Sequence, residues 1–142
     1  MNELQTSNIQ LQNKRQMPTN SIQGEKIYDI RERLIRFSNR MIQIVRSLPR
    51  TIEGEVIIRQ LAKSGTSIGA NFEEADGALT KKDFMNKVAI ARKEAKETKY
   101  WLRLLAGNSL PEETIRKDIQ EAEEIICILS AILKKLGYQF RL

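Results

Sequence analysis

The chain contains no histidine and only one cysteine among its 142 residues. The absence of histidine removes the commonest general base and the commonest metal ligand from the residues available for catalysis. One cysteine cannot form an internal disulfide, so the sequence fits a reducing compartment. Because Cys127 lies in the apolar run of residues 125–129, we expect a small buried thiol and no reactive group.

Long apolar runs are also missing from the chain. None reaches the roughly 18 residues that a membrane-spanning helix needs. The first residues lack a charged stretch followed by an apolar stretch, the pattern of a secretory signal. We therefore expect a cytoplasmic protein with no membrane partner.

Strand patterns and internal repeats are absent, apart from a short alternation in residues 138–142 that could not form a sheet alone. Residues 1–24 are rich in Gln, Asn, Ser and Thr and have no sustained period. This composition predicts a flexible N-terminal tail at 1–24, followed by one folded domain at 25–142.

Helical periodicity dominates the rest of the chain. Apolar side chains recur at steps of three and four residues, which is typical of one buried helix face. This spacing holds over four segments: 27–48, 57–75, 84–105 and 115–136. Four such stripes joined by short loops predict an all-α, antiparallel up-down four-helix bundle.

Local signals mark where these helices begin and end. Pro49 must end the first helix, because proline cannot continue it. Thr51 and Thr80 are suitable N-caps for the second and third helices. Pro111 is suited to the first turn of the fourth helix, and Gly137 fits the position just after its end.

Small and polar residues interrupt the second helix. Ser64, Gly65 and Gly69 lie at positions where tight packing against another helix is a better explanation than phosphate binding, since a phosphate site needs a loop that leads into a helix N-terminus. The stripe also places Asn71 in the core. A buried amide must be hydrogen-bonded, and we expect Glu94 and Glu97 as its partners.

The positive charge of the chain, +6 in total, is concentrated on two helices. Residues 26–50 and 80–108 each carry a net charge of +5, whereas 51–79 carry −3 and 109–142 carry −1. Basic side chains flank the core stripe of both positive helices: Arg33, Arg36 and Arg40 on the first, and Arg92, Lys96, Lys99 and Arg103 on the third. Such rows favour contact with the phosphate backbone of a nucleic acid, although salt-bridged or solvated faces, offset by Glu32, Glu94 and Glu97, are the alternative.

Two helices carry apolar side chains beyond one stripe. The additional residues are Ile90, Tyr100, Trp101 and Leu104 on the third helix, and Ile125, Ile128 and Ile132 on the fourth. A monomeric bundle needs one apolar stripe per helix, and aromatic residues are enriched at interfaces. The third-helix residues therefore predict a subunit interface, with a wide core stripe as the alternative.

Carboxylates could form a metal site, with Glu73, Glu94 and Glu97 as the candidate ligands. Metal sites in four-helix bundles use Glu-x-x-His pairs, and this chain has no histidine. Solvated or buried structural carboxylates are the better interpretation, so we expect no metal, no other cofactor and no enzymatic activity.

Four segments together resemble the 23S rRNA-intervening sequence protein family: 64–71 (SGTSIGAN), 81–84 (KKDF), 93–98 (KEAKET) and 100–102 (YWL). The resemblance covers about residues 26–136. It implies an up-down four-helix bundle that assembles as a ring-shaped homopentamer, and it transfers no catalytic residue. A distantly related branch includes the accessory variability determinant of diversity-generating retroelements, which partners a reverse transcriptase and nucleic acid.

These observations rank three hypotheses. The first is a non-enzymatic homo-oligomer that binds RNA or DNA, or acts as a scaffold, through the basic rows. The second is a pure protein–protein interaction module, such as a reverse-transcriptase accessory. The third is a carboxylate-metal enzyme.

Overall fold

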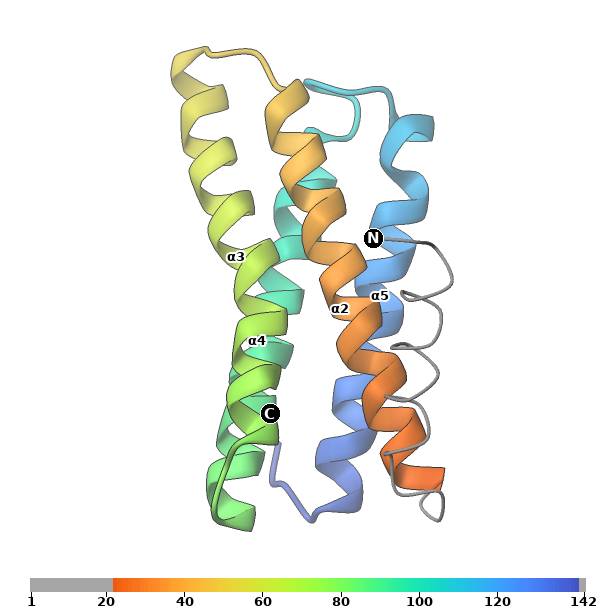
Figure 1. The fold of residues 1–142 in the computed structure, drawn as a ribbon. Helices are drawn as coiled ribbons and strands as arrows, with labels where there is room; N and C mark the ends of the chain where they lie inside the picture. Colours follow the sequence, from red (N-terminus) through yellow and green to blue (C-terminus); the bar gives the residue numbers. More distant parts are fainter. Residues whose placement is uncertain (1–21, 141–142) are drawn as a thin grey trace, which may run out of the picture. The chain divides into compact units, whose positions relative to one another are not determined.

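Four consecutive helices make up the computed structural model, which describes the backbone of residues 22–140 and the side chains of residues 30–140 (Figure 1). The helices are α2 (Ile22–Ser47), α3 (Ile52–Asp76), α4 (Lys81–Leu105) and α5 (Glu112–Lys135). Residues 22–140 contain no strand, and their only β feature is one isolated bridge between Ala106 and Leu110. The all-α prediction is confirmed.

The helix boundaries depend on the residues that the local signals indicate. The hydroxyl of Thr51 accepts a hydrogen bond from the Gly54 amide at 3.0 Å, and that of Thr80 accepts one from the Asp83 amide at 3.1 Å. Each satisfies an amide that has no partner within its own helix. Pro111 occupies the N-cap position directly before α5. Gly137, with φ of 79°, ends α5 as predicted, because glycine adopts this left-handed conformation without steric cost.

Consecutive helices run in opposite directions, as Figure 1 shows for α3, α4 and α5. Helix α4 packs against both α3 and α5. From Arg31 onward, α2 is joined to α3 through the Arg31–Glu73 ion pair and to α5 through the Arg33–Glu121 ion pair. Each helix therefore has two neighbours. Helices α3 and α5 each lie between the two basic helices, α2 and α4.

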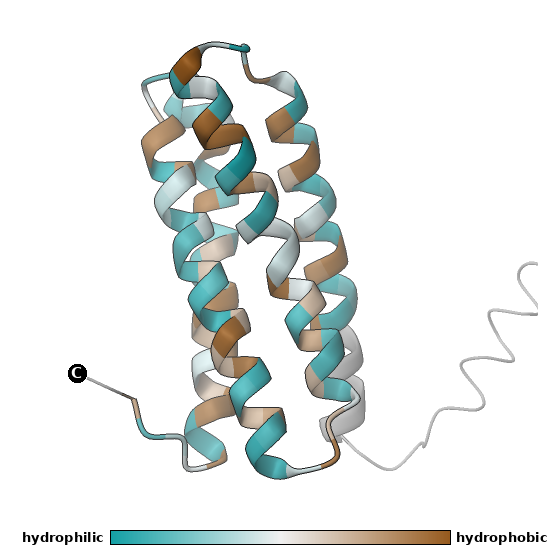
Figure 2. Ribbon diagram, turned by 90° about the vertical axis from the view of Figure 1, so that its left-hand side faces the viewer, coloured by the Kyte–Doolittle hydropathy of each residue, from teal (hydrophilic) through white to brown (hydrophobic). Residues whose placement is uncertain are grey.

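From Arg31 onward, apolar and polar residues alternate along each helix (Figure 2). The core of the unit that begins at Arg31 is built from the apolar face of each helix: Leu34, Phe37, Met41, Ile44 and Leu48 from α2, Leu61, Ile68, Phe72 and Ala75 from α3, Val88, Ala91, Ala95 and Leu102 from α4, and Ile115, Ala122, Ile125, Leu129 and Leu133 from α5. The predicted stripes of α2 and α4 lie in this core almost throughout.

The predicted core position of Asn71 is wrong. Its neighbour Phe72 is buried at 1% exposure, whereas Asn71 is half-buried. The Asn71 amide donates a hydrogen bond to the Ser67 carbonyl of its own helix at 2.8 Å instead of reaching Glu94 or Glu97. The helix therefore turns Phe72 and not Asn71 toward the core, whereas Ile68 and Ala75 of the same predicted stripe are buried.

The inner face of α5 also departs from the predicted stripe, although Ala122, Leu129 and Leu133 are buried as expected. Ile125 is fully buried, although it was predicted to belong to an outer face, and Ile126 is only half-buried. Ile128 and Ile132 are half-buried, so they extend the core stripe. Cys127 is exposed, which contradicts the expected buried thiol.

The small-residue segment of α3 packs against α2, as predicted for Gly65. A Cβ atom at Gly65 would lie 2.6 Å from Cγ and 2.8 Å from Cβ of Met41, which is closer than atoms can approach. The Ser38 hydroxyl donates a hydrogen bond to the Gly65 carbonyl at 3.2 Å. Gly69 is different, because a Cβ there would meet Leu34 at an ordinary 3.6 Å. Of the two glycines in this segment, close approach therefore requires Gly65 and not Gly69.

Polar side chains in this segment bond to their own helix. Thr66 donates to the Ala62 carbonyl at 2.7 Å, and Ser67 donates to the Lys63 carbonyl at 2.6 Å. These contacts satisfy hydroxyl groups that otherwise compete with helix formation. Ser64 is 1% exposed, and its hydroxyl has no hydrogen-bond partner in the described part of the chain. The segment is thus a packing element of α3.

The predicted tail at residues 1–24 lies outside the described residues as far as residue 21, and its flexibility stays a prediction. Of the alternating segment at 138–142, residues 138–140 belong to no helix or strand and the last two residues are not described. Within the described chain, no helix combines the length and apolar character required to cross a membrane.

Candidate nucleic-acid interface

The first basic row lies on α2 and consists of Arg33, Arg36 and Arg40, named here the α2 row. Arg33 donates hydrogen bonds to two carboxylates of α5, Glu121 and Glu124. The hydrogen bond with Glu121 raises the pKa of the Arg33 guanidinium. Arg33, the first residue of the α2 row, is therefore bound to α5.

The last residue of the α2 row, Arg40, is also bound to a carboxylate of α5. Arg40 makes two parallel hydrogen bonds to Asp118, with Nε–Oδ1 of 3.0 Å and Nη2–Oδ2 of 3.1 Å. Asp118 is 8% exposed, so the pair compensates a carboxylate that is largely removed from water. The α2 row lines a groove of about 430 Å³ with Phe37, Asp118 and Glu121, and the exposed Arg36 is the member with no ion pair among the described residues.

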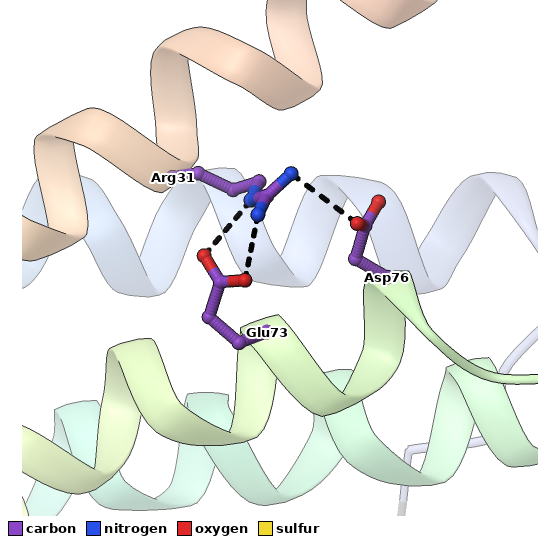
Figure 3. Close-up of polar contacts among 3 residues, drawn as sticks. All are labelled: Arg31, Glu73 and Asp76. Atoms are coloured by element: carbon purple, nitrogen blue, oxygen red, sulfur yellow. Dashed lines mark hydrogen bonds and ion pairs between the residues drawn. The ribbon is translucent and has the colours of Figure 1, made fainter.

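A further arginine of α2 is held on the opposite side, by α3. Figure 3 shows the Arg31 guanidinium between Glu73 and Asp76. Arg31 donates to the two Glu73 oxygens at 2.9 and 2.6 Å, and its Nη1 lies 3.2 Å from Asp76. The hydrogen bond lowers the pKa of Glu73 and raises that of Arg31. Three of four arginines in this part of α2 are thus bound to carboxylates.

The second basic row, named the α4 row, consists of Arg92, Lys96, Lys99 and Arg103. One carboxylate contacts it: Lys99 donates a hydrogen bond to Glu123 of α5. Lys96 and Arg103 are exposed and form no ion pair with any residue between 30 and 140. Unlike the α2 row, the α4 row keeps most of its positive charge uncompensated.

Arg92 contacts neutral groups only. Its Nε donates a hydrogen bond to the Ser130 hydroxyl at 2.7 Å, and its guanidinium lies 5.0 Å from the centre of the Phe140 ring. Neither contact neutralises the charge, and the cation–π geometry fixes the orientation of the group. Arg92 therefore adds to the positive potential of the α4–α5 surface.

The predicted subunit interface on α4 is partly exposed. Ile90, Tyr100 and Leu104 are 40%, 55% and 37% exposed, respectively. Trp101 is half-buried and donates its indole N–H to Glu97 at 3.2 Å. At the start of α3, Ile52 and Val56 add two more exposed apolar side chains. These surfaces are available for contacts with another chain.

The three candidate metal ligands do not converge. Glu73 pairs with Arg31 on the α2 side of α3, whereas Glu97 contacts Trp101 on α4. Burial, followed by repulsion from Glu97, raises the pKa of Glu94. No group of three or more potential metal-binding side chains occurs in residues 30–140.

The carboxylates that decide which row is compensated were not among the predicted site residues. Asp118, Glu121 and Glu124 face α2, whereas Glu123 faces α4. The positions of Asp118 and Glu121, four residues and one residue before the core residue Ala122, were a usable signal, because they place both beside the buried stripe. The acids expected to offset the rows, Glu94 and Glu97, form no ion pair with them.

Fold and surface together define a helical bundle protein with an apolar core and one basic face that is largely uncompensated. The family model of the 23S rRNA-intervening sequence protein matches residues 26–131, and the chain belongs to this family.

A solved structure supports the same assignment. The chain is 35% identical to a protein from Bacteroides thetaiotaomicron VPI-5482, described as a protein of unknown function from the S23 ribosomal protein family, with a TM-score of 0.71. The match covers 77% of this chain and 98% of that one. No curated protein matches the chain.

Proposed function

We propose that this protein is a non-enzymatic accessory protein that binds the phosphate backbone of RNA or DNA through the α4 row. The observation that carries the proposal is the charge balance of that row. Four cations line one face of α4, and Glu123 is the one described carboxylate that pairs with them. By contrast, carboxylates of α5 bind both Arg33 and Arg40 of the α2 row.

Exposed cations suit phosphate contacts for an electrostatic reason. Each lysine or arginine that neutralises a phosphate releases a condensed counterion, so affinity falls steeply with salt and does not depend on base sequence. Cations that already bind a carboxylate must give up that contact first. Lys96 and Arg103 need no such exchange with a described residue, and they are the side chains we expect to contribute most.

Self-assembly is part of the proposal. The exposed apolar side chains Ile90 and Leu104, with Trp101 beside them, support a subunit interface on α4. A homo-oligomer, and the homopentamer implied by the family resemblance, would repeat the α4 row around a ring. Repetition converts a weak contact into a strong one by raising the effective concentration of the remaining sites.

The proposal includes no catalytic step, metal or cofactor. Glu73 is bound by Arg31 on the α2 side of α3, apart from Glu94 and Glu97 on α4. The single cysteine fits a reducing compartment such as the cytoplasm.

The test is light scattering coupled to size exclusion, with and without a generic structured RNA, at low and high salt. We expect an oligomer that increases in mass with RNA at low salt only. A monomer would contradict the assembly, and an oligomer that ignores RNA at low salt would contradict nucleic-acid binding.

The second candidate is a protein-docking scaffold, for example a reverse-transcriptase accessory. It is favoured by Ile52 and Val56, which are 88% and 53% exposed at the start of α3. This candidate predicts that charge reversal of all four residues of the α4 row leaves capture of a protein partner intact, whereas nucleic-acid binding requires the row.

A further inference from the structure

We propose that the α4 surface prefers single-stranded nucleic acid, with Tyr100 as the platform on which a base stacks. This inference rests on the proposed function and adds a substrate class to it. An electrostatic row alone would favour a duplex, because a duplex carries twice the phosphates of one strand along the same length. An aromatic platform between the cations reverses that preference, since only unpaired bases offer a free face.

The position of Tyr100 supports this role. It follows Lys96 by four residues and precedes Arg103 by three, so both cations lie one helical turn from the ring on the same side of α4. Lys93 is exposed two turns before it. These three cations form no ion pair with any described carboxylate, and the carboxylate of Glu97, one turn before the ring, accepts the hydrogen bond of Trp101.

The orientation of the ring is already determined in the free protein. Tyr100 makes an edge contact with Trp101, with 5.0 Å between ring centres and 72° between ring planes. Trp101 is itself held by its hydrogen bond to Glu97. Tyr100 is still 55% exposed, and the subunit interface proposed above uses Ile90, Trp101 and Leu104 without Tyr100, so ring surface remains for a base. A preorganised aromatic side chain loses little conformational entropy on binding.

A second aromatic side chain lies at the other end of the row. Phe140 contacts the Arg92 guanidinium, is 37% exposed, and is supported by Tyr138 through an edge contact with 5.1 Å between ring centres. The row spans about 16 Å from Arg92 to Arg103, at 1.5 Å per helical residue. Tyr100 lies between Lys96 and Arg103 and Phe140 lies beside Arg92, so the row combines cations with aromatic faces, as surfaces that bind single strands do.

The experiment measures the affinity for an oligothymidylate of about 15 nucleotides and for a duplex of the same length, at one low salt concentration. Trp101 is the single tryptophan of the chain and touches Tyr100, so its fluorescence reports a base that stacks there. We expect the wild-type protein to prefer the single strand. Tyr100→Leu should reduce single-strand affinity by about 5-fold to 100-fold and leave duplex affinity unchanged.

Tyr100→Phe is the matched control, because it keeps the aromatic face and loses only the hydroxyl. Both variants keep apolar bulk at the position, and light scattering of each checks that assembly is unaltered. The inference is supported if the phenylalanine variant keeps the single-strand preference and the leucine variant loses it. It is overturned if both variants behave as wild type, or if the leucine variant weakens both ligands equally.

The two proposals fail in different ways. If the wild-type protein binds neither oligonucleotide at low salt, the proposed function fails and this inference fails with it. If the protein binds both oligonucleotides with steep salt dependence, but its affinities do not change when the ring at position 100 is removed, only the single-strand preference is refuted.

Discussion

The α2 and α4 rows have similar sequence patterns and opposite surroundings. Both place basic residues at helical spacing beside a core stripe, and both lie next to α5. Yet α5 directs Asp118, Glu121 and Glu124 toward α2 and only Glu123 toward α4. A basic stripe can therefore be part of the internal structure or an open surface, depending on which side chains the neighbouring helix directs toward it.

This difference assigns separate roles to the two rows. Ion pairs on two sides, together with the close approach at Gly65, bind α2 to its neighbours. Changes in α2 should therefore alter stability. Changes in the exposed members of the α4 row should alter binding and leave the fold intact.

The largest expected effect is on nucleic-acid affinity. The double substitution Lys96→Glu and Arg103→Glu should weaken binding at low salt by about 100-fold, because two phosphate contacts are replaced by two repulsions. Its urea midpoint should stay close to that of the wild type, since neither side chain pairs with a described residue. The control is the double substitution Arg33→Glu and Arg40→Glu, which changes the net charge of the protein by the same amount. An equal loss of affinity without unfolding in this control would break the distinction between the rows.

Gly65→Ala should lower the free energy of unfolding by about 1 to 3 kcal/mol, because the added Cβ collides with Met41. Gly69→Ala is the matched control in the same helix. It meets Leu34 at 3.6 Å, and its higher helix propensity should make it neutral or stabilising by up to about 1 kcal/mol. Urea denaturation of both variants measures the difference. Equal effects would show that α2 does not depend on close approach at position 65.

Arg40→Ala should destabilise the fold by about 1 to 3 kcal/mol, since it leaves the largely buried Asp118 carboxylate without its partner. Arg36→Ala, in the same row, should stay within about 0.5 kcal/mol of the wild type. Adding Asp118→Asn to Arg40→Ala should recover part of the loss, because the uncompensated charge is removed. No recovery would indicate that the packing of the arginine stem, and not the pair, stabilises the helix.

The smallest effect concerns pH and the Arg31–Glu73 pair. Arg31 holds the pKa of Glu73 below its ordinary value, so the folded state favours the charged carboxylate. The stabilisation is present above the unfolded pKa of about 4.3 and is lost as the pH falls through the lower folded value. Both side chains are more than a third exposed, so we expect the pair to contribute less than about 1 kcal/mol to the free energy of unfolding. Glu73→Gln should flatten the loss of stability between neutral and acidic pH.

Glu94 should behave in the opposite way, because burial raises its pKa. Protonation then favours the folded state, so this group costs stability above its folded pKa and the cost disappears as the pH falls. Glu94→Gln should therefore stabilise the protein slightly at neutral pH and show less change on acidification. A variant that is less stable at neutral pH would mean that the carboxylate makes a favourable contact in the folded state.

Much of the fold could be predicted because the signals are local. Thr51 and Thr80 cap the helices that they were expected to cap, and Gly137 has the left-handed conformation that its position required. The core face of α2 followed directly from its apolar spacing. Where two apolar residues were adjacent, as Ile125 and Ile126 are, spacing alone could not choose the buried one. The rotation of a helix about its axis is set by its packing partners.

The candidate site was predictable only in part. Every residue of the two rows was identified from charge and spacing, but nothing in α2 or α4 reveals that Asp118 binds Arg40 or that Glu123 binds Lys99. These pairs join residues far apart in the sequence.

The sequence by itself determined four amphipathic helices, their order, most of their ends and the concentration of basic charge on the first and third of them. These properties depend on contacts within a few residues, through caps, turns and the 3.6-residue period. Only the tertiary structure decided which basic row is neutralised, why Gly65 must be glycine, and which aromatic ring lies open among cations. Those outcomes depend on the level and rotation at which two helices meet, which the packing of the whole core determines.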